Sequence, residues 1–267
     1  MERLTRYRRP AVGLGLAVLI ASVLAGNFLY WGAQSRDALE PTLSFPVDVL
    51  EGAEPATAGD SVRVMTWNIA YARGGVWLAG ETHSKVEVVG VLERIAHHVA
   101  AVDPDVLALQ EVDFASDRTS GVDELAWLQR RLGYPYAAWV TTWEVRYVPY
   151  PAWPIEAHAG AIHMGMAVLS KHPVVSNVRH HLPEPSETSA LYDAFYVKRA
   201  VQHVGIDVGG QRLHVFNTHL ESMFLDNRRV QIGVMGAVVD EACACVDDVC
   251  RARCLVLGDM NSPPTGG

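Results

Sequence analysis

The N-terminal segment constrains this chain more than any other feature. Four arginines within the first ten residues precede a run from Ala11 to Gly32 that holds 22 residues and no charge. At about 1.5 Å rise per residue, a helix of this length crosses a hydrocarbon core about 30 Å thick. The basic start and the aromatic residues between Phe28 and Trp31 predict a cytoplasmic N-terminus with an outer aromatic belt. Residues 1–32 are therefore expected to be a transmembrane anchor that places the domain outside the cytoplasm.

A cleaved signal peptide is the alternative for the same segment. Val23-Leu24-Ala25 is an acceptable cleavage site, and cleavage there would make the protein secreted. The anchor is favoured because the apolar run continues beyond that site.

The charge balance limits the partners of the domain. The formal net charge is -8, and because the first ten residues carry +3, the remainder carries -11. A body this acidic has no broad basic face for a duplex backbone, so duplex nucleic acid is disfavoured as a partner. Any phosphate is expected to be held by metal ions or by a few local donors. With 49% hydrophobic residues, the chain has enough apolar material for one sizeable core.

All four cysteines fall within twelve residues, at Cys243, Cys245, Cys250 and Cys254. In an exported protein such a cluster favours a local disulfide, although the sequence leaves the pairing open. A zinc site is the alternative, but the spacing lacks the paired C-x2-C knuckles of common zinc modules.

The pattern after the apolar segment predicts a linker and one domain. Residues 33–60 contain several prolines and small residues and are expected to be a tether, and residues 61–267 to form the domain. Short apolar runs alternate with helical patterns, which predicts strands at 62–68, 105–111, 136–142, 164–170, 199–208, 211–219 and 254–259, and helices at 84–101, around 125–132 and at 227–247. The chain between 142 and 164 is expected to be irregular. Gly209-Gly210 predicts a two-residue hairpin. Hairpins mixed with strand–helix units indicate an α/β protein in packed layers.

Several predicted strands end in polar residues. Apolar runs stop at Asn68, at Glu111, at Asn217-Thr218-His219 and at Asp259-Met260-Asn261. Residues i and i+2 of an extended strand share a face, so Asn217 with His219, and Asp259 with Asn261, are expected to point the same way. Carboxylate and carboxamide oxygens are ligands for Mg²⁺, Mn²⁺ or Ca²⁺, and a histidine adds a donor or proton carrier. The strand ends therefore predict one convergent polar site.

These segments resemble the endonuclease/exonuclease/phosphatase superfamily, from about Val62 to the end of the chain. The resemblance rests on five strings in the family order, namely Thr66-Trp67-Asn68-Ile69, Leu109-Gln110-Glu111-Val112, Met166-Ala167-Val168-Leu169-Ser170, Asn217-Thr218-His219-Leu220 and Leu257-Gly258-Asp259-Met260-Asn261. It implies a four-layered α/β-β/α sandwich, with two packed mixed sheets flanked by helices. It also implies metal-dependent cleavage of a phosphoester, with Mg²⁺ (or Mn²⁺ or Ca²⁺) as the cofactor.

The resemblance assigns roles to the residues at the strand ends. Glu111 is expected to be the main magnesium ligand with Asn68 beside it. Asp259 and Asn261 are expected to align the attacking water and hold the phosphate, and His219 to contact the scissile phosphate.

Three further residues are candidates for substrate binding. His163 stands where several relatives place a tyrosine or asparagine near the phosphate, and Asn217 shares the face of His219. Arg199 could approach a phosphate, and the alternative is an ordinary strand charge.

The resemblance to the family ends at Asn261. The family closes with a further aspartate-bearing strand and a Ser-Asp-His string, but the last histidine of this chain is His219. The sequence therefore predicts a truncated fragment, with a pseudoenzyme as the alternative, and a chain that is inactive as given. Loss of an acid–base residue typically costs about 10²–10⁴ in rate.

Three functions remain open from the sequence. The favoured one is a membrane-tethered, extracytoplasmic phosphodiesterase or phosphatase that acts on a lipid or small phosphoester as a monomer. The alternatives are an extracellular nuclease of the same superfamily and a non-catalytic, membrane-tethered binding domain. The aromatic and proline-rich stretch from Trp139 to Trp153 could stack on a base, enter a lipid interface or cover the core.

Overall fold

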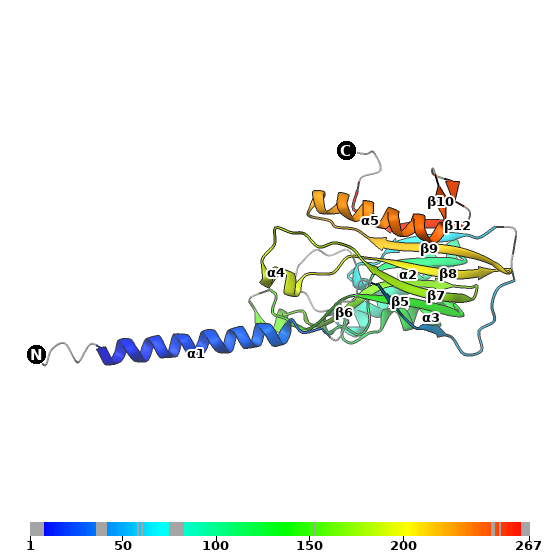
Figure 1. The fold of residues 1–267 in the computed structure, drawn as a ribbon. Coiled ribbons are helices and arrows are strands. Elements are labelled where there is room, and N and C mark those ends of the chain that lie inside the picture. The colour runs from blue at the N-terminus through cyan, green and yellow to red at the C-terminus, as the bar shows by residue number, and fades with distance from the viewer. Residues whose placement is uncertain are drawn as a thin grey trace, which may run out of the picture.

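A computed structural model gives the structure, which describes residues 8–35, 42–57, 59, 61–74, 83–151, 153–246, 249–250 and 252–262. One long helix projects from a body built of two sheets (Figure 1). In chain order the elements are α1 (Arg8–Gly32), β1 (Thr42–Ser44), β2 (Val47–Val49), β3 (Val64–Asn68), η1 (Ala70–Ala72), α2 (Lys85–Val102), β4 (Val106–Asp113), η2 (Asp117–Thr119), α3 (Glu124–Leu132), β5 (Tyr136–Val148), η3 (Ile155–Ala157), β6 (Gly160–Ser170), β7 (Val174–His181), α4 (Ala190–Phe195), β8 (Ala200–Val208), β9 (Gln211–His219), α5 (Leu225–Cys243), β10 (Cys245–Val246), β11 (Val249–Cys250) and β12 (Arg253–Asp259).

The two large sheets pack face to face and confirm the layered architecture. One has the strand order β2-β5-β6-β4-β3 and the other β1-β7-β8-β9-β12. Small aliphatic side chains from both sheets form the inner core, including Val106, Ala108 and Val168 from the first and Val215 and Leu257 from the second. Helices α2 and α3 pack on the outer face of the first sheet and α5 on that of the second.

The helices begin and end where the local sequence dictates. Helix α2 starts at a capping box in which the Ser84 side chain accepts from the Glu87 N–H and Glu87 accepts from the Ser84 N–H. Helix α3 starts after Asp123, whose side chain accepts from Ala126, and ends at Gly133 with φ of 73°. These caps fix the helices that cover the first sheet.

Two parallel strand pairs bring four strand ends to one end of the sandwich. Strand β3 runs parallel to β4, with Asn68 opposite Gln110, and β9 runs parallel to β12, with His219 opposite Asp259. The carboxyl ends of parallel neighbours lie at the same edge of a sheet. The topology therefore gathers the polar residues that end these strands.

A β-bulge in β4 changes the direction of Glu111. Between the pairs Leu109–Ala167 and Val112–Gly165, two residues of β4 lie opposite the single residue Met166 of β6. Glu111 takes φ of 52°, in the left-handed region that non-glycine residues seldom adopt. The bulge places Gln110 and Glu111 in succession on the side of the other sheet.

The structure differs from the sequence prediction in three segments. The chain between residues 142 and 164, expected to be irregular, forms most of a long hairpin of β5 and β6 that pair from Tyr136–Ser170 to Val148–Gly160. The predicted tether contributes two short edge strands, since β1 pairs with β7 and β2 with β5. Strand β7 itself was absent from the prediction. The hairpin of β8 and β9 is confirmed, with Gly209 and Gly210 at positive φ in its turn.

A disulfide joins Cys243, at the end of α5, to Cys254, near the start of β12. The bond closes the connection that carries the chain from the covering helix to the last strand. The side chains of Cys245 and Cys250 lie outside the described residues. The predicted local disulfide is therefore present, and its pairing is now assigned.

Three histidines form a stack on the outer face of the second sheet. The ring of His203 lies 6.1 Å from that of His180 and 5.1 Å from that of His214, and it stacks on Phe216 at 4.4 Å between ring centroids. His203 Nε2 is 2.8 Å from His214 Nδ1. Burial, followed by the charges of His214, His180 and Arg212, lowers the pKa of His203 from 6.5 to about 4.

This shift predicts a loss of stability in mild acid. Between pH 6.5 and about 4 the unfolded chain binds a proton at His203 that the folded chain does not, so the free energy of unfolding falls as the pH falls through this window. Urea unfolding of the full chain in detergent should show a lower midpoint at pH 5 than at pH 7. The decrease should be smaller for His203→Gln and unchanged for His97→Gln, which alters an exposed residue of α2. An equal decrease in all three proteins would contradict the assignment.

Candidate metal centre

Five polar side chains from four strand ends meet at one end of the sandwich. Asn68 ends β3, Glu111 lies in the bulge of β4, His219 ends β9, Asp259 ends β12 and Asn261 follows two residues later. The first two come from one sheet and the other three from the second sheet or its continuation. The convergence expected from the sequence is therefore present in the structure.

Asn68 joins the two carboxylates. Its Nδ2 donates to Glu111 Oε1 at 3.0 Å and to Asp259 Oδ2 at 2.9 Å, while its Oδ1 accepts from the Ala70 N–H at 3.0 Å. Two carboxylate oxygens from different sheets thus lie within one hydrogen bond of the same nitrogen. In this orientation Asn68 bridges the carboxylates through its NH₂ group. Its predicted role as a metal ligand would require the amide to turn and present Oδ1.

His219 lies beside both carboxylates as a neutral imidazole. Its Nε2 is 3.9 Å from Glu111 Oε1 and 3.7 Å from Asp259 Oδ2. Burial and the positive charge of Arg199 lower its pKa to about 4, against the opposing effect of the carboxylates. The two contacts are therefore not ion pairs at neutral pH, and His219 leaves the carboxylate charges unbalanced.

Asp259 and Asn261 form a tight turn after β12. The Asn261 N–H donates to Asp259 Oδ1 at 3.0 Å, and Asn261 has φ of 49°, so the strand tip does not stay extended. Asn261 Nδ2 donates to the carbonyl of Leu220 at 2.8 Å. Burial raises the pKa of Asp259, but the hydrogen bonds from Asn68 and Asn261 and the neighbouring positive charge outweigh it, so the pKa is lowered. Asp259 is therefore held as a carboxylate.

Gly258 lets β12 approach β9 closely at the site. A Cβ at this position would lie 2.0 Å from the carbonyl oxygen of Thr218, and its φ is 137°. A larger residue would push Asp259 away from His219. An open cavity of about 340 Å³ lies next to this turn, lined by Thr66, Trp67, Asn68, Gln110, Gly258, Asp259, Met260, Asn261 and Ser262.

Asn217 shares the face of His219 but lies deeper, in the core between the sheets. Its side chain is fully buried, and it accepts from Gln110 Nε2 at 2.7 Å and donates to Gln202 Oε1 at 3.1 Å. It also donates to the carbonyls of Leu109 and Ala167. In this structure the side chain of Asn217 is not exposed, and the substrate contact expected from the sequence stays a prediction. Asn217 ties β9 to the strand that carries Glu111.

Arg199 lies near the site but is held by protein groups. Its side chain is 7% exposed, its Nη2 donates to Ser222 Oγ at 3.3 Å and its Nε is 3.9 Å from Glu221 Oε2. Glu221 is fully buried and accepts from the hydroxyl of Tyr196. Sequence analysis did not identify Glu221 or Tyr196, since neither belongs to a strand-end pattern. Arg199 therefore contributes a fixed positive charge beside His219.

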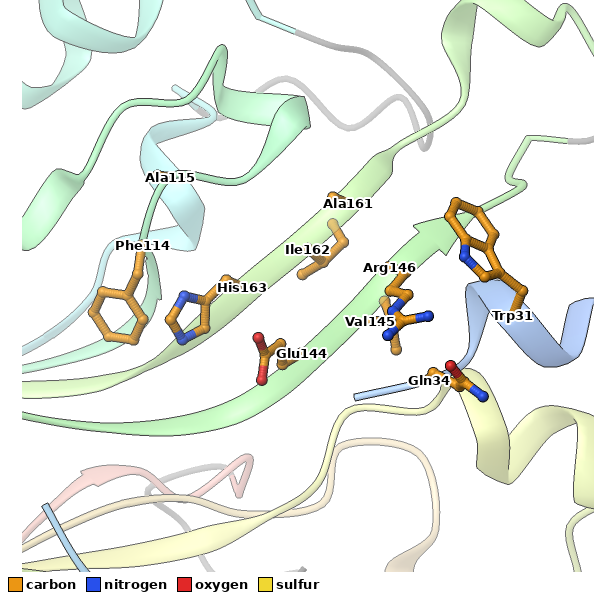
Figure 2. Close-up of a pocket in the computed structure, with 10 residues that line it drawn as sticks. All are labelled: Trp31, Gln34, Phe114, Ala115, Glu144, Val145, Arg146, Ala161, Ile162 and His163. Carbon is orange, nitrogen blue, oxygen red and sulfur yellow. The ribbon is translucent and has the colours of Figure 1, made fainter. Parts of the chain in front are cut away.

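His163 packs against aromatic side chains of the first sheet. Its Nε2 is 3.1 Å from Thr141 Oγ1, and its ring packs edge-on against Phe114 and Trp139 at 5.2 and 6.0 Å between ring centroids. Figure 2 shows His163 beside Phe114. Trp139 and Phe114 belong to the core beneath α2 and α3, on the outer side of the first sheet. The described side-chain contacts of His163 are with Thr141, Phe114 and Trp139, and its place at the phosphate stays a prediction.

The donor set fits a magnesium ion better than a closed metal cage. Within the described part of the chain, no group of three or more His, Cys, Asp and Glu side chains is arranged to hold a metal. Magnesium keeps several waters and is bound through one or two carboxylates together with substrate phosphates, whereas zinc takes three or four protein ligands. Asp259 lines an open cavity together with Asn68, and Glu111 adds a second carboxylate through the same Asn68 nitrogen. A divalent cation there would offset their charge.

Comparison with known proteins gives a consistent result. A model of the Endonuclease/Exonuclease/phosphatase family matches residues 65–267. The solved structure of an endonuclease/exonuclease/phosphatase from Beutenbergia cavernae is 27% identical, with a TM-score of 0.50, over 77% of this chain and 50% of that one. No curated protein sequence matches the chain.

Two further solved structures are similar to the chain at lower identity. TDP2 from Caenorhabditis elegans is 22% identical over 80% of this chain and 50% of that chain, with a TM-score of 0.45. The human Nocturnin catalytic domain with bound sulfate is 19% identical over 83% of this chain and 69% of that chain, with a TM-score of 0.48. The chain thus spans about half the length of the first structures that it matches.

The buried position of Asn217 predicts a large stability effect. Asn217→Ala would leave the side chains of Gln110 and Gln202 and two carbonyls with unmade hydrogen bonds, which we expect to lower the free energy of unfolding by roughly 2–4 kcal/mol. Asn227→Ala removes one exposed hydrogen bond to Pro183 and should change it by less than about 0.5 kcal/mol. Denaturant unfolding of the full chain in detergent measures both. An Asn217→Ala variant as stable as the wild type would show that the network does not tie the sheets together.

Proposed function

This chain belongs to the endonuclease/exonuclease/phosphatase family, and from that premise we propose that it is a metal-dependent phosphoesterase tethered to a membrane. The observation that carries the proposal is the pair Glu111 and Asp259, which meet across two sheets at the same Asn68 nitrogen. Like charges held this close at a partly buried position are stabilised by a cation, and an anionic phosphoester would be drawn to that cation.

Each residue of the site would have a separate role in phosphoester cleavage. A divalent ion, when bound, supplies Lewis-acid stabilisation of the phosphoryl oxygens. Glu111 would hold that ion, and Asp259, kept ionised by Asn68 and Asn261, would orient the attacking water. His219 is neutral and carries an N–H donor, so it would stabilise a phosphoryl oxygen without competing for the cation. Arg199 would add a fixed positive charge behind His219.

We propose a location outside the cytoplasm and a lipid or small phosphoester as substrate. Residues Leu14–Gly32 of α1 form a helix long and apolar enough to cross a membrane, and its side chains are exposed. The Cys243–Cys254 disulfide suits an oxidising compartment. The whole chain has a net charge of -8, and this negative charge disfavours a nucleic-acid duplex as substrate.

Metal binding tests the site more directly than turnover does, because it depends on the carboxylates of Glu111 and Asp259 alone.

Metal binding should depend on both carboxylates. Calorimetric titration of the full chain in detergent with MnCl₂ should show one site, and Glu111→Gln and Asp259→Asn should each weaken it at least about tenfold, because each removes one anionic ligand. Asp240→Asn, which neutralises an exposed carboxylate of α5, should bind as the wild type does. Equal binding by all four proteins would overturn the proposed site.

Activity should follow the same residues and should discriminate between substrates. With magnesium and high protein concentration, hydrolysis of bis-p-nitrophenyl phosphate should fall at least about a hundredfold in Glu111→Ala and in Asp259→Ala. Sphingomyelin and inositol phosphates should be cleaved in preference to plasmid DNA. Efficient cleavage of plasmid DNA would favour a nuclease, and binding without any turnover would favour a non-catalytic binding domain.

A further inference from the structure

The tip of the β5–β6 hairpin, described at residues 149–151 and 153–159, carries exposed apolar side chains. Trp153 is 77% exposed, and Tyr150 and Ile155 are each 56% exposed. Tryptophan and tyrosine prefer the interface between lipid and water, where the ring enters the apolar layer and the polar atom stays hydrated. A cluster of this composition at a hairpin tip has the chemistry of a membrane-docking loop.

The end of α1 packs directly on the strand that leads to this tip. The ring of Tyr147 lies 5.5 Å from that of Phe28 and 6.5 Å from that of Trp31. Gly32 approaches so closely that a Cβ there would lie 2.7 Å from the carbonyl oxygen of Tyr147. The hairpin and the helix are therefore in contact just before the tip begins.

Strand β5 runs antiparallel to α1 at this contact. Residues 143–145 line a cavity together with Ala33 and Ser35, which follow the helix, whereas Tyr147 contacts Phe28 and Trp31, which lie within it. Along β5, the contacts therefore move from the residues that follow α1 back onto the helix itself. Figure 1 shows α1 projecting from the side of the body where β6 and α4 lie.

The level of the lipid interface follows from the length of α1. The 19 residues of Leu14–Gly32 span about 28 Å at 1.5 Å per residue, close to the thickness of a hydrocarbon core. Gly32 and Tyr147 would then lie at the membrane surface. A cavity of about 490 Å³ at this level is lined by Gln34, Glu144 and Arg146, polar residues that suit the headgroup layer (Figure 2).

The same end of the sandwich carries the metal centre. Strand β5 is antiparallel to β6, and β6 is antiparallel to β4, so β5 and β4 end on the same side of the first sheet. Strand β3 is parallel to β4, and its last residue, Asn68, contacts Asp259 at the end of β12. The strand ends that form the site and the tip of the hairpin therefore face the same direction.

We propose that the β5–β6 tip inserts into the lipid interface beside α1 and fixes the sandwich with its metal centre facing the membrane. The inference rests on the anchoring role proposed for α1. The tip acts as a second contact, so the domain cannot rotate freely about a single tether. The metal centre would then face the headgroup layer, the source of a lipid phosphoester.

Tryptophan quenching in vesicles tests this proposal without requiring activity. The full chain is reconstituted in phosphatidylcholine vesicles with or without lipid brominated near the headgroup end of its acyl chains. We compare the wild type with the variants Trp153→Phe, Trp31→Phe and Trp127→Phe. Trp127→Phe is the control, because Trp127 is a partly buried residue of α3 that packs on the first sheet. Trp153→Phe and Trp31→Phe should each reduce the quenched fraction of the emission, and Trp127→Phe should not.

The three variants separate failure of the tip from failure of the anchor. A quenched fraction that falls in Trp31→Phe but not in Trp153→Phe overturns the proposed insertion of the tip and leaves the anchor intact. A quenched fraction unchanged in both variants places α1 outside the bilayer and overturns the anchor and the insertion together.

Discussion

The structure depends on holding two carboxylates together across the junction of two sheets. Glu111 and Asp259 lie far apart in the sequence and in different sheets, and each accepts a hydrogen bond from Asn68. Their mutual repulsion opposes this arrangement, and neutral His219 does not relieve it. The geometry is maintained by the buried amides of Gln110, Asn217 and Gln202, which link the sheets directly beneath the site. A divalent cation bound between the two carboxylates would attract both of them and offset their mutual repulsion.

The parts of this arrangement that follow from local sequence patterns were predictable. Buried strands that stop at polar residues indicated Asn68, Glu111, His219 and Asp259, because an apolar run has a clear end. The parts set by register were not predictable. The bulge at Glu111 lies in a strand pattern that contains no glycine or proline to mark it. This bulge, and the register shifts between β5 and β6, decide which face of the sheet each following side chain takes. For this reason the strand pattern put Asn217 on the face of His219 but did not show that it lies buried between the sheets. His163 was placed near the phosphate by the family resemblance, and its ring packs against Phe114 on the outer side of the first sheet.

The fold also relates the site to the apolar helix. Parallel pairing of β3 with β4 and of β9 with β12 directs four strand ends one way, and the β5–β6 hairpin ends in the same direction beside α1. The sequence suggested a lipid interface as one of three fates for the aromatic stretch around Trp153, but only the long hairpin, which replaced a predicted irregular segment, shows where those residues are carried. The position of these aromatic residues beside α1, rather than their composition, favours the lipid interface over the other two alternatives.

The claim that these strand ends build one metal centre is tested most directly by locating a metal. Crystals of the full chain grown with manganese would give an anomalous-difference map that marks the ion without assuming any ligand. The account predicts a single strong peak in coordination contact with a Glu111 carboxylate oxygen, on the side facing Asp259. A strong peak elsewhere, with none beside Glu111, would contradict it.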